Sequence, residues 1–202
     1  MNFLAHFLLS ADDDELRLGN LLGDTVKGRV ERFDHPGVSE RMRTGIRLHR
    51  TIDSFSDRHP VVRRSKQRIA GRYGLLSGVL VDIYYDHVLA REWPVHGQGD
   101  LDAFADDVHR TLRVNLARLP GDVHPLVHAM TRGRWLTGYA SIEGVASALR
   151  GMARRTPVAA GIGGAADDLA AQYGEFSADF AEFFPALRAH CDAFLARAAS
   201  AP

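Results

Sequence analysis

The segment Leu75–Trp93, "LLSGVLVDIYYDHVLAREW", constrains the fold more than any other part of the sequence. If it is helical, its apolar residues cover nearly the whole circumference, which is typical of a helix buried on most sides. Asp82, Asp86 and His87 lie within it. A buried carboxylate costs on the order of several kcal/mol unless a cation or hydrogen-bond donors compensate. We therefore expect arginines or a metal ion opposite these two carboxylates.

Helical periodicity extends along most of the chain, and proline and glycine fall between the periodic segments. The predicted helices span residues 14–30, 38–58, 60–72, 75–93, 100–118, 123–135, 141–154 and 164–198. No segment alternates convincingly as a strand would. The expected fold is all-α, a compact multi-helix bundle formed by one domain over residues 1–202.

Cysteine content and hydropathy narrow the class of protein. The single cysteine, Cys191, excludes an internal disulfide framework and a cysteine-rich zinc site, so a metal would have to rest on histidine and acidic residues. No run approaches the roughly 18 apolar residues that a membrane span needs, and the start "MNFLAHFLLS" has no basic leader. These features predict a cytoplasmic protein without a membrane partner.

The charges are balanced in number but not in position. Lys+Arg and Asp+Glu both total 25, whereas residues 41–72 hold ten basic residues against two acidic ones. A polarised charge distribution of this kind suits an acidic partner. Nucleic acid is not indicated, because aromatic residues do not interleave with the basic stretch as a base-stacking surface requires.

Three predicted helices carry metal-ligand types at four-residue spacing, which places each pair on one helical face. The pairs are Asn20 with Asp24, His49 with Asp53, and Asp82 with Asp86, the last followed directly by His87. Carboxylate oxygens suit hard divalent cations, and Mn, Fe and Zn also accept imidazole. Converging helices of this kind would form a mixed His/Asp metal site.

Each of these residues also has a purely structural interpretation. Asp24 alone fits a helix cap or a solvated face, and His49 with Asp53 fits a surface pair. Asp57 and His59 fit a helix end, because "SDRHP" breaks toward Pro60. His6 is by default a core histidine with satisfied hydrogen bonds. For Asp82 and Asp86 a functional role is favoured, since an apolar helix offers them no easy contact with solvent.

Two other motifs are weak. Cys191 follows His190 directly, and adjacent helical residues point apart, which argues against a Cys-His nucleophile pair. The sequence "GIGGAADD" from Gly161 has neither a preceding strand nor a following GK[ST], so it indicates a loop and not a phosphate cradle.

Taken together, the motifs resemble those of the acyl-carrier-protein phosphodiesterases, a divergent branch of the HD metal-dependent phosphohydrolases. The resemblance rests on "MNFLAH" at the start, "GNLLGDTVKG" from Gly19, "GIRLHRTIDSFSDRHP" from Gly45, "DIYYDHVLAREW" from Asp82 and "GMARR" from Gly151. It implies an HD-phosphohydrolase-like helical fold. It also implies hydrolysis of the phosphodiester that joins 4'-phosphopantetheine to a serine of holo acyl carrier protein.

The resemblance further implies a divalent metal, with Mn²⁺ favoured and Mg²⁺ or Fe²⁺ as alternatives. By this likeness, the expected metal ligands are Asp24, His49, Asp53 and Asp86. Asp82 and His87 would accept or donate protons in the reaction, and His6 and Asn20 would hold the metal ligands in orientation. The superfamily signature is a His followed by an Asp, whereas this chain has Asp86 followed by His87.

Acyl carrier proteins are acidic helical domains, so the basic stretch has a candidate role in docking. The arginines expected to steer that encounter are Arg43, Arg47, Arg50, Arg63, Arg64 and Arg68. The alternative is an ordinary solvated helix face. Two other functions stay open at this point: a phosphohydrolase of a nucleotide or another small phosphate ester, and a non-catalytic helical adaptor for an acidic protein. The sequence does not indicate an oligomeric state.

Overall fold

A computed structural model describes residues 1–155 and 161–200, and these residues form helices and turns without a strand. The prediction of an all-α fold is confirmed. The α-helices are α1 (Phe3–Leu8), α2 (Asp14–Leu22), α3 (Glu40–Arg58), α4 (Pro60–Tyr73), α5 (Ser77–Arg91), α6 (Trp93–His96), α7 (Leu101–Val114), α8 (His124–Arg132), α9 (Trp135–Gly138), α10 (Ile142–Arg155), α11 (Ala165–Ala171) and α12 (Tyr173–Ser200). Short 3-10 turns lie at Val30–Arg32, Gly74–Leu76, Leu116–Arg118 and Gly121–Val123.

Local capping explains several of the helix starts. Asp13 accepts a hydrogen bond from the Leu16 amide at the start of α2, and Ser39 accepts one from the Met42 amide at the start of α3. Pro60 occupies the first turn of α4, where its missing N–H is not needed. The break predicted at His59 therefore separates α3 from α4, as expected.

Several predicted boundaries were wrong. The segment predicted as one helix over 14–30 is helical only to Leu22. The segment predicted over 164–198 is two helices, α11 and α12, separated at Gln172. The short helix α1 was not predicted, because six residues span less than two turns and show no clear helical period.

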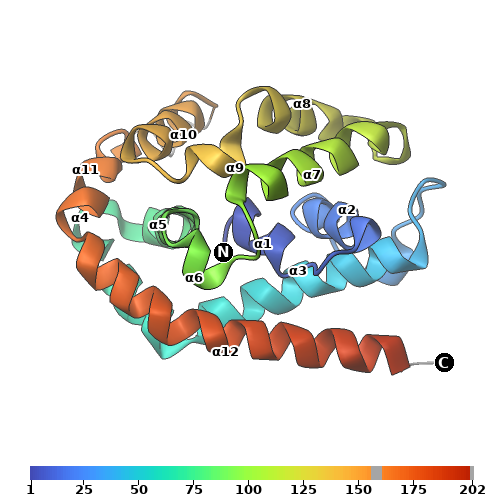
Figure 1. Cartoon of the computed structure of the whole chain (residues 1–202), viewed down its shortest axis with the longest axis horizontal. Helices are drawn as coiled ribbons and strands as arrows, with labels where there is room; N and C mark the ends of the chain where they lie inside the picture. The colour runs from blue at the N-terminus through green and yellow to red at the C-terminus, as the bar shows by residue number, and fades with distance from the viewer. Residues whose placement is uncertain (156–160, 201–202) are drawn as a thin grey trace.

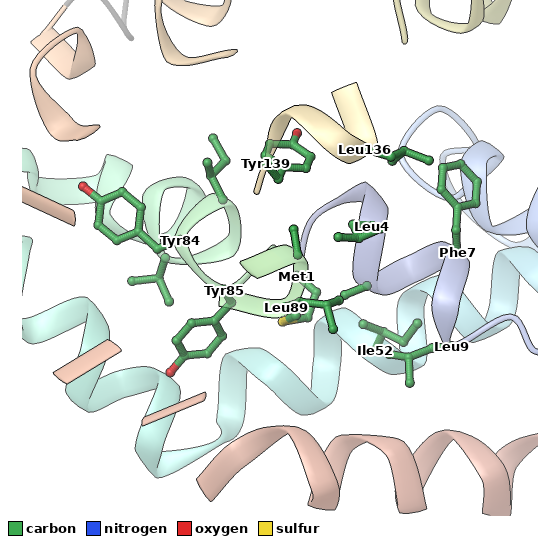
Figure 2. Packing of buried hydrophobic residues seen from close by; sticks show 14 of the residues in the cluster. Met1, Leu4, Phe7, Leu9, Ile52, Tyr84, Tyr85, Leu89, Leu136 and Tyr139 are labelled. Carbon is green, nitrogen blue, oxygen red and sulfur yellow. The ribbon is translucent and has the colours of Figure 1, made fainter. Parts of the chain in front are cut away.

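Helices α1 and α5 lie at the centre of the molecule (Figure 1), with α12 and α3 on one side and α7 to α10 on the other. The core is continuous across these elements: Leu4 and Phe7 of α1 pack with Leu89 of α5 and Leu136 of α9 (Figure 2). In α5, eleven of fifteen residues are buried, which confirms the prediction of a helix surrounded on most sides. Among the described residues, none of the helices is both long enough and apolar enough to cross a membrane.

Helices α2 and α3 approach each other at two glycines. A Cβ placed on Gly45 would lie 2.4 Å from the Leu16 carbonyl oxygen, and one on Gly19 would lie 1.9 Å from the Met42 carbonyl oxygen. Both neighbours are backbone atoms, so no side-chain rotation can relieve the overlap. The glycines therefore allow a close crossing of α2 and α3, the helices that carry Asn20, His49 and Asp53.

We expect Gly45→Ala to lower the free energy of unfolding by about 1–3 kcal/mol, the usual range for an overpacked core. Gly71→Ala is the matched control, because Gly71 lies within α4 and its added Cβ would meet nothing within 4 Å. That variant should be as stable as the wild type or up to about 1 kcal/mol more stable, since alanine favours a helix over glycine. Urea unfolding followed by circular dichroism measures both; equal stability of the two variants would contradict the close crossing.

Candidate metal centre

Three side chains from α1 and α3 converge on one point. His6 Nε2 lies 3.2 Å from Asp53 Oδ1, and His49 Nε2 lies 3.0 Å from Asp53 Oδ2. The two imidazole rings stack with their centroids 4.2 Å apart. One ligand atom from each of the three residues lies within 4.8 Å of the other two, close enough for a single cation to contact all three.

Asp24 extends this cluster from the turn after α2. Its Oδ1 lies 3.3 Å from His49 Nε2, so that nitrogen lies between two carboxylates. The ring of His49 in turn requires Gly23, because a Cβ there would lie 2.1 Å from the imidazole. The structure thus brings together Asp24, His49 and Asp53, which the sequence assigned to one centre.

The cluster opens into a pocket of about 370 Å³. Besides the residues of the cluster, Ser56 and Asp57 of α3 and Asp82 of α5 line it. Val79, Ile83 and Met152 form an apolar wall, and Asn2 is a further polar residue of the lining. The pocket therefore combines metal-ligand types with apolar side chains that can contact an uncharged chain.

The electrostatics of the cluster favour ionised carboxylates. Burial lowers the pKa of His49, but its contacts with Asp24 and Asp53 outweigh this and raise the pKa to about 9. Burial opposes ionisation of Asp53, yet His49 and His6 hold its pKa well below the usual range. The contact with His49 likewise lowers the pKa of Asp24. Burial lowers the pKa of His6 despite its contact with Asp53, so this imidazole favours the neutral form.

The donor set fits a divalent metal ion. His6 Nε2 is buried and, despite its closeness to Asp53, has no hydrogen bond of good geometry. A lone pair held in this way beside carboxylate oxygens is the arrangement that a metal ligand needs. Imidazole nitrogen combined with carboxylate oxygen suits Mn, Fe or Zn.

Asp82 of α5 lines the same pocket as the cluster of His6, His49 and Asp53. Its Oδ1 is 3.0 Å from the amino group of Met1, and that amino group lies 3.9 Å from Asp53 Oδ1. Burial lowers the pKa of this amine, but Asp82 and Asp53 outweigh that effect and raise it. Asp82 therefore faces the pocket with a positive charge beside it, while its side chain stays 35% exposed.

Comparisons with known proteins identify the family of this chain. The profile of the family described as "Acyl carrier protein phosphodiesterase" matches residues 1–187. The chain belongs to this family.

Bacterial relatives cover nearly the whole chain. The acyl carrier protein phosphodiesterase of Pectobacterium atrosepticum is 33% identical over 186 residues, which is 92% of this chain and 94% of the relative. That of Photorhabdus laumondii is 33% identical over 189 residues, 92% of each chain. That of Yersinia enterocolitica is 30% identical over 188 residues, 93% of this chain and 95% of the relative. No solved structure matches the chain.

In this acyl carrier protein phosphodiesterase family member, Asp86 does not line the pocket, which differs from the expected ligand role. It is fully buried, and its two oxygens accept hydrogen bonds from the amides of Leu4 and Ala5 at 2.7 and 3.2 Å. Burial raises the pKa of Asp86 to about 7, although these donors oppose the rise. The expectation was an arginine or a metal ion, but among the described residues the backbone amides in the first turn of α1 compensate this carboxylate. Asp86 thereby fixes the helix that carries His6.

His87 also lies away from the pocket. Its Nδ1 donates a hydrogen bond to the Tyr139 carbonyl oxygen at 2.7 Å, and its ring meets that of Tyr173 edge to face. The residue is fully buried, and burial lowers its pKa. Asp86 and His87 therefore contact two different elements, α1 and the Tyr139 carbonyl, and neither side chain lines the pocket.

His6 is the candidate ligand that sequence reasoning did not assign. A lone histidine in an apolar stretch predicts a core residue, and His6 is indeed only 4% exposed. His6 and Asp53 are 47 positions apart in the chain, so no short sequence spacing indicates their contact. The only signal was the position of His6 within the motif "MNFLAH".

Two of the predicted docking arginines instead hold the segment after α2 against α3. Arg50 donates hydrogen bonds to the carbonyl oxygens of Val26 and Gly28, each at 2.7 Å. Arg43 donates to the carbonyl oxygens of Val30, at 2.9 Å, and Phe33. The carbonyls of Val26, Gly28 and Val30 lie within residues 14–30, which were predicted to form one helix. Arginine side chains satisfy these carbonyls in place of helical amides.

The other four predicted docking arginines differ in whether they form ion pairs within the molecule. Arg47 pairs with Glu31 and Glu40, and Arg64 and Arg68 both pair with the buried Asp179 of α12. Within the described part of the chain, Arg63 has no carboxylate partner, and its guanidinium donates only to the Arg58 carbonyl oxygen at 2.9 Å. Most of the basic stretch is therefore bound within the molecule.

Proposed function

We propose that this protein hydrolyses the phosphodiester between 4'-phosphopantetheine and a serine of holo acyl carrier protein, releasing the apo carrier. The observation that carries the proposal is the convergence of His6, His49 and Asp53 on one pocket. Support comes from the family to which the chain belongs, whose relatives bear the name acyl carrier protein phosphodiesterase. The mixed His/Asp donors on helices also support a place within the HD phosphohydrolases.

In this proposal, His6 Nε2, His49 Nε2 and Asp53 hold one divalent metal ion, with Asp24 as a further ligand at the rim. Mn²⁺ is the favoured ion. When bound, a divalent cation supplies positive charge to the phosphodiester oxygens and lowers the pKa of a coordinated water. Asp53 and Asp24 offset part of that charge and keep the histidines in place.

Asp82 and the apolar wall of the pocket bind and orient the substrate. Asp82 lies on the pocket with a half-buried carboxylate, where it can accept a proton from the attacking water or return one to the departing serine oxygen. Val79, Ile83 and Met152 line the apolar wall and suit the uncharged pantetheine arm. We assign Asp86 to holding α1, and no step of the reaction to His87.

Docking of the acidic carrier falls mainly to cations that have no acidic partner among the residues that the structure describes. Arg63 is such a residue, and Arg58, at the end of α3, is exposed next to Asp57 of the pocket. Arg43 and Arg50 are instead proposed to shape the pocket by holding the segment that follows Asp24. An electrostatic contribution from Arg58 and Arg63 weakens as the ionic strength rises. A cytoplasmic location follows from this choice of substrate.

The decisive experiment incubates holo acyl carrier protein with the enzyme and Mn(II) and measures the mass of the carrier. We expect the mass to fall by that of the 4'-phosphopantetheine group, and EDTA to prevent the change. A panel of free nucleotides serves as the comparison. Turnover of nucleotides but not of holo carrier would overturn the substrate assignment, and a purified protein that neither binds Mn(II) nor turns over holo carrier would be an adaptor.

A further inference from the structure

The buried side chain of Asn20 connects the two histidines of the centre. Its Oδ1 lies 2.7 Å from His6 Nδ1 and 3.1 Å from His49 Nδ1. The backbone carbonyl oxygen of Asn20 lies 2.9 Å from the same nitrogen of His49. Asn20 is 1% exposed, so water does not compete for these contacts.

The other end of the Asn20 amide fixes its orientation. Nδ2 donates hydrogen bonds to the His6 carbonyl oxygen and to Ser10 Oγ, both at 2.9 Å. Ser10 Oγ donates to that carbonyl as well, at 2.8 Å. A flipped amide would place Oδ1 against the His6 carbonyl, so two acceptors would face each other without a proton. The amide oxygen must therefore point to the imidazoles.

An oxygen that faces an imidazole nitrogen requires a proton on that nitrogen. Oδ1 has two lone pairs and can accept from both Nδ1 atoms, while the backbone carbonyl adds a second acceptor for His49. In a neutral imidazole the proton then resides on Nδ1, and Nε2 keeps its lone pair. In both histidines Nε2 is the nitrogen that faces Asp53.

We propose that Asn20 is a positioning residue that holds His6 and His49 in the Nδ1–H tautomer, so that both Nε2 lone pairs point at one cation. This inference rests on the proposed function, because it concerns the same metal centre. It assigns a single amide to two ligands on two different helices. Mutation of a residue that hydrogen-bonds to a metal-bound histidine usually lowers metal affinity by about 10–100-fold.

The first test reads the tautomers directly. Long-range ¹H–¹⁵N spectra of the metal-free protein, recorded where each imidazole is neutral, should show the proton on Nδ1 of His6 and His49. Spectra of the Zn(II)-loaded protein should show that Nδ1 keeps its proton. A proton on Nε2 of either residue in the neutral, metal-free state would overturn the inference.

The second test compares Mn(II) binding among three variants. Asn20→Leu removes the acceptor and both donors, and should weaken Mn(II) binding by about 10–100-fold. Asn20→Asp keeps an acceptor for both Nδ1 protons but loses the donors to the His6 carbonyl and Ser10. It should be less stable than the wild type and yet bind Mn(II) at least as tightly. Ser10→Ala removes only the hydroxyl that accepts a hydrogen bond from Asn20 Nδ2. It should leave Mn(II) affinity within about twofold, because His6 and His49 both keep the acceptor for their Nδ1 protons.

If Asn20 had only a structural role, the Mn(II) affinities of the variants would follow a different pattern. In that case Asn20→Asp, which loses the same donors as Asn20→Leu, would lose Mn(II) affinity with it, or Asn20→Leu would bind Mn(II) as the wild type does. Either result would overturn the inference. Should Asn20→Leu fail to fold, the Asn20→Asp affinity and the wild-type tautomers still decide the question. A wild type that binds no Mn(II) contradicts the proposed function, whereas the tautomers test Asn20 independently.

Discussion

Replacing Asp53 with asparagine is expected to lower kcat/KM for holo carrier hydrolysis on the order of 10³-fold or more, as loss of one member of a catalytic unit does. Asparagine keeps the volume of the side chain but removes the charge that both histidines face. The variant would lose the one carboxylate shared by His6 and His49, and with it most of the affinity for the metal ion. Initial rates with holo carrier and Mn(II) titrations measure the two effects.

Asp57→Asn is the matched control for this variant. Asp57 lies one turn further along α3, also lines the pocket, and forms an exposed ion pair with Lys66 at 2.8 Å. Exposed pairs contribute at most about 1 kcal/mol to stability, so the variant should stay folded. Asp57 is outside the cluster of His6, His49 and Asp53, so we expect the rate of the variant to stay close to that of the wild type. Urea unfolding of both variants checks that they are folded in the assay. A folded Asp53→Asn enzyme with a rate near that of the wild type would remove Asp53 from the centre.

Helix positions were predictable wherever a local signal marks them. Ser39 and Pro60 mark the starts of α3 and α4, so the predicted and observed bounds of these helices agree within two residues. The end of α2 also has a local signal, because Gly23 follows Leu22 directly and forms the C-cap. The prediction instead followed the spacing of Val26 and Val30, which could continue a helix. Arg50 and Arg43 of α3 bind carbonyls of this segment in another conformation, and these contacts between distant residues leave no mark in the local sequence.

The candidate centre was predictable only in part, for a similar reason. His49 and Asp53 share a helical face, and their contact follows directly from four-residue spacing. The cost of burying Asp86 was recognised correctly, but its compensation was not. Backbone amides of a helix more than eighty positions earlier supply it, and amides leave no mark in a residue pattern. His6 joins the centre through that same contact.

The basic stretch illustrates a limit of counting charges. Ten basic residues against two acidic ones predict a docking face when only nearby sequence is considered. The structure pairs Arg64 and Arg68 with Asp179, more than a hundred positions away. Local excess charge is therefore neutralised by the fold, and only cations without such partners, Arg63 among them, can contribute fully to an external field.

Metal affinity is expected to rise steeply with pH, because His49 must lose a proton before Nε2 can bind a cation. The contacts with Asp24 and Asp53 outweigh burial and raise the pKa of His49 to about 9 in the metal-free protein. The Mn(II) association constant should therefore rise about tenfold from pH 7 to pH 8, and more slowly as the titration of His49 nears completion. Competition titrations at fixed ionic strength measure this slope.

The stability of the metal-free protein should change in the opposite direction. The pKa of His49 is higher in the folded chain than in the unfolded one, about 6.5, so its contribution is fully present below pH 6.5 and is lost as pH rises through 9. In EDTA, the free energy of unfolding should fall by about 2 kcal/mol between pH 7 and pH 9. The Met1 amine, whose pKa is also raised, adds to this loss, so His49→Gln is needed to isolate the share of the histidine.

Two variants separate His49 from other titrating groups. Asp24→Asn removes one of the two carboxylates that raise the pKa of His49, so the Mn(II) association constant should level off at a lower pH. His128→Gln changes an exposed histidine of α8 outside the pocket and should leave both slopes as they are. If the Mn(II) affinity of the wild type is flat from pH 7 to pH 9, His49 carries no proton that the metal must displace. The ion would then bind through Asp53, His6 and Asp24 without His49, and the pairing of His49 with two carboxylates would only hold α3 to the turn after α2.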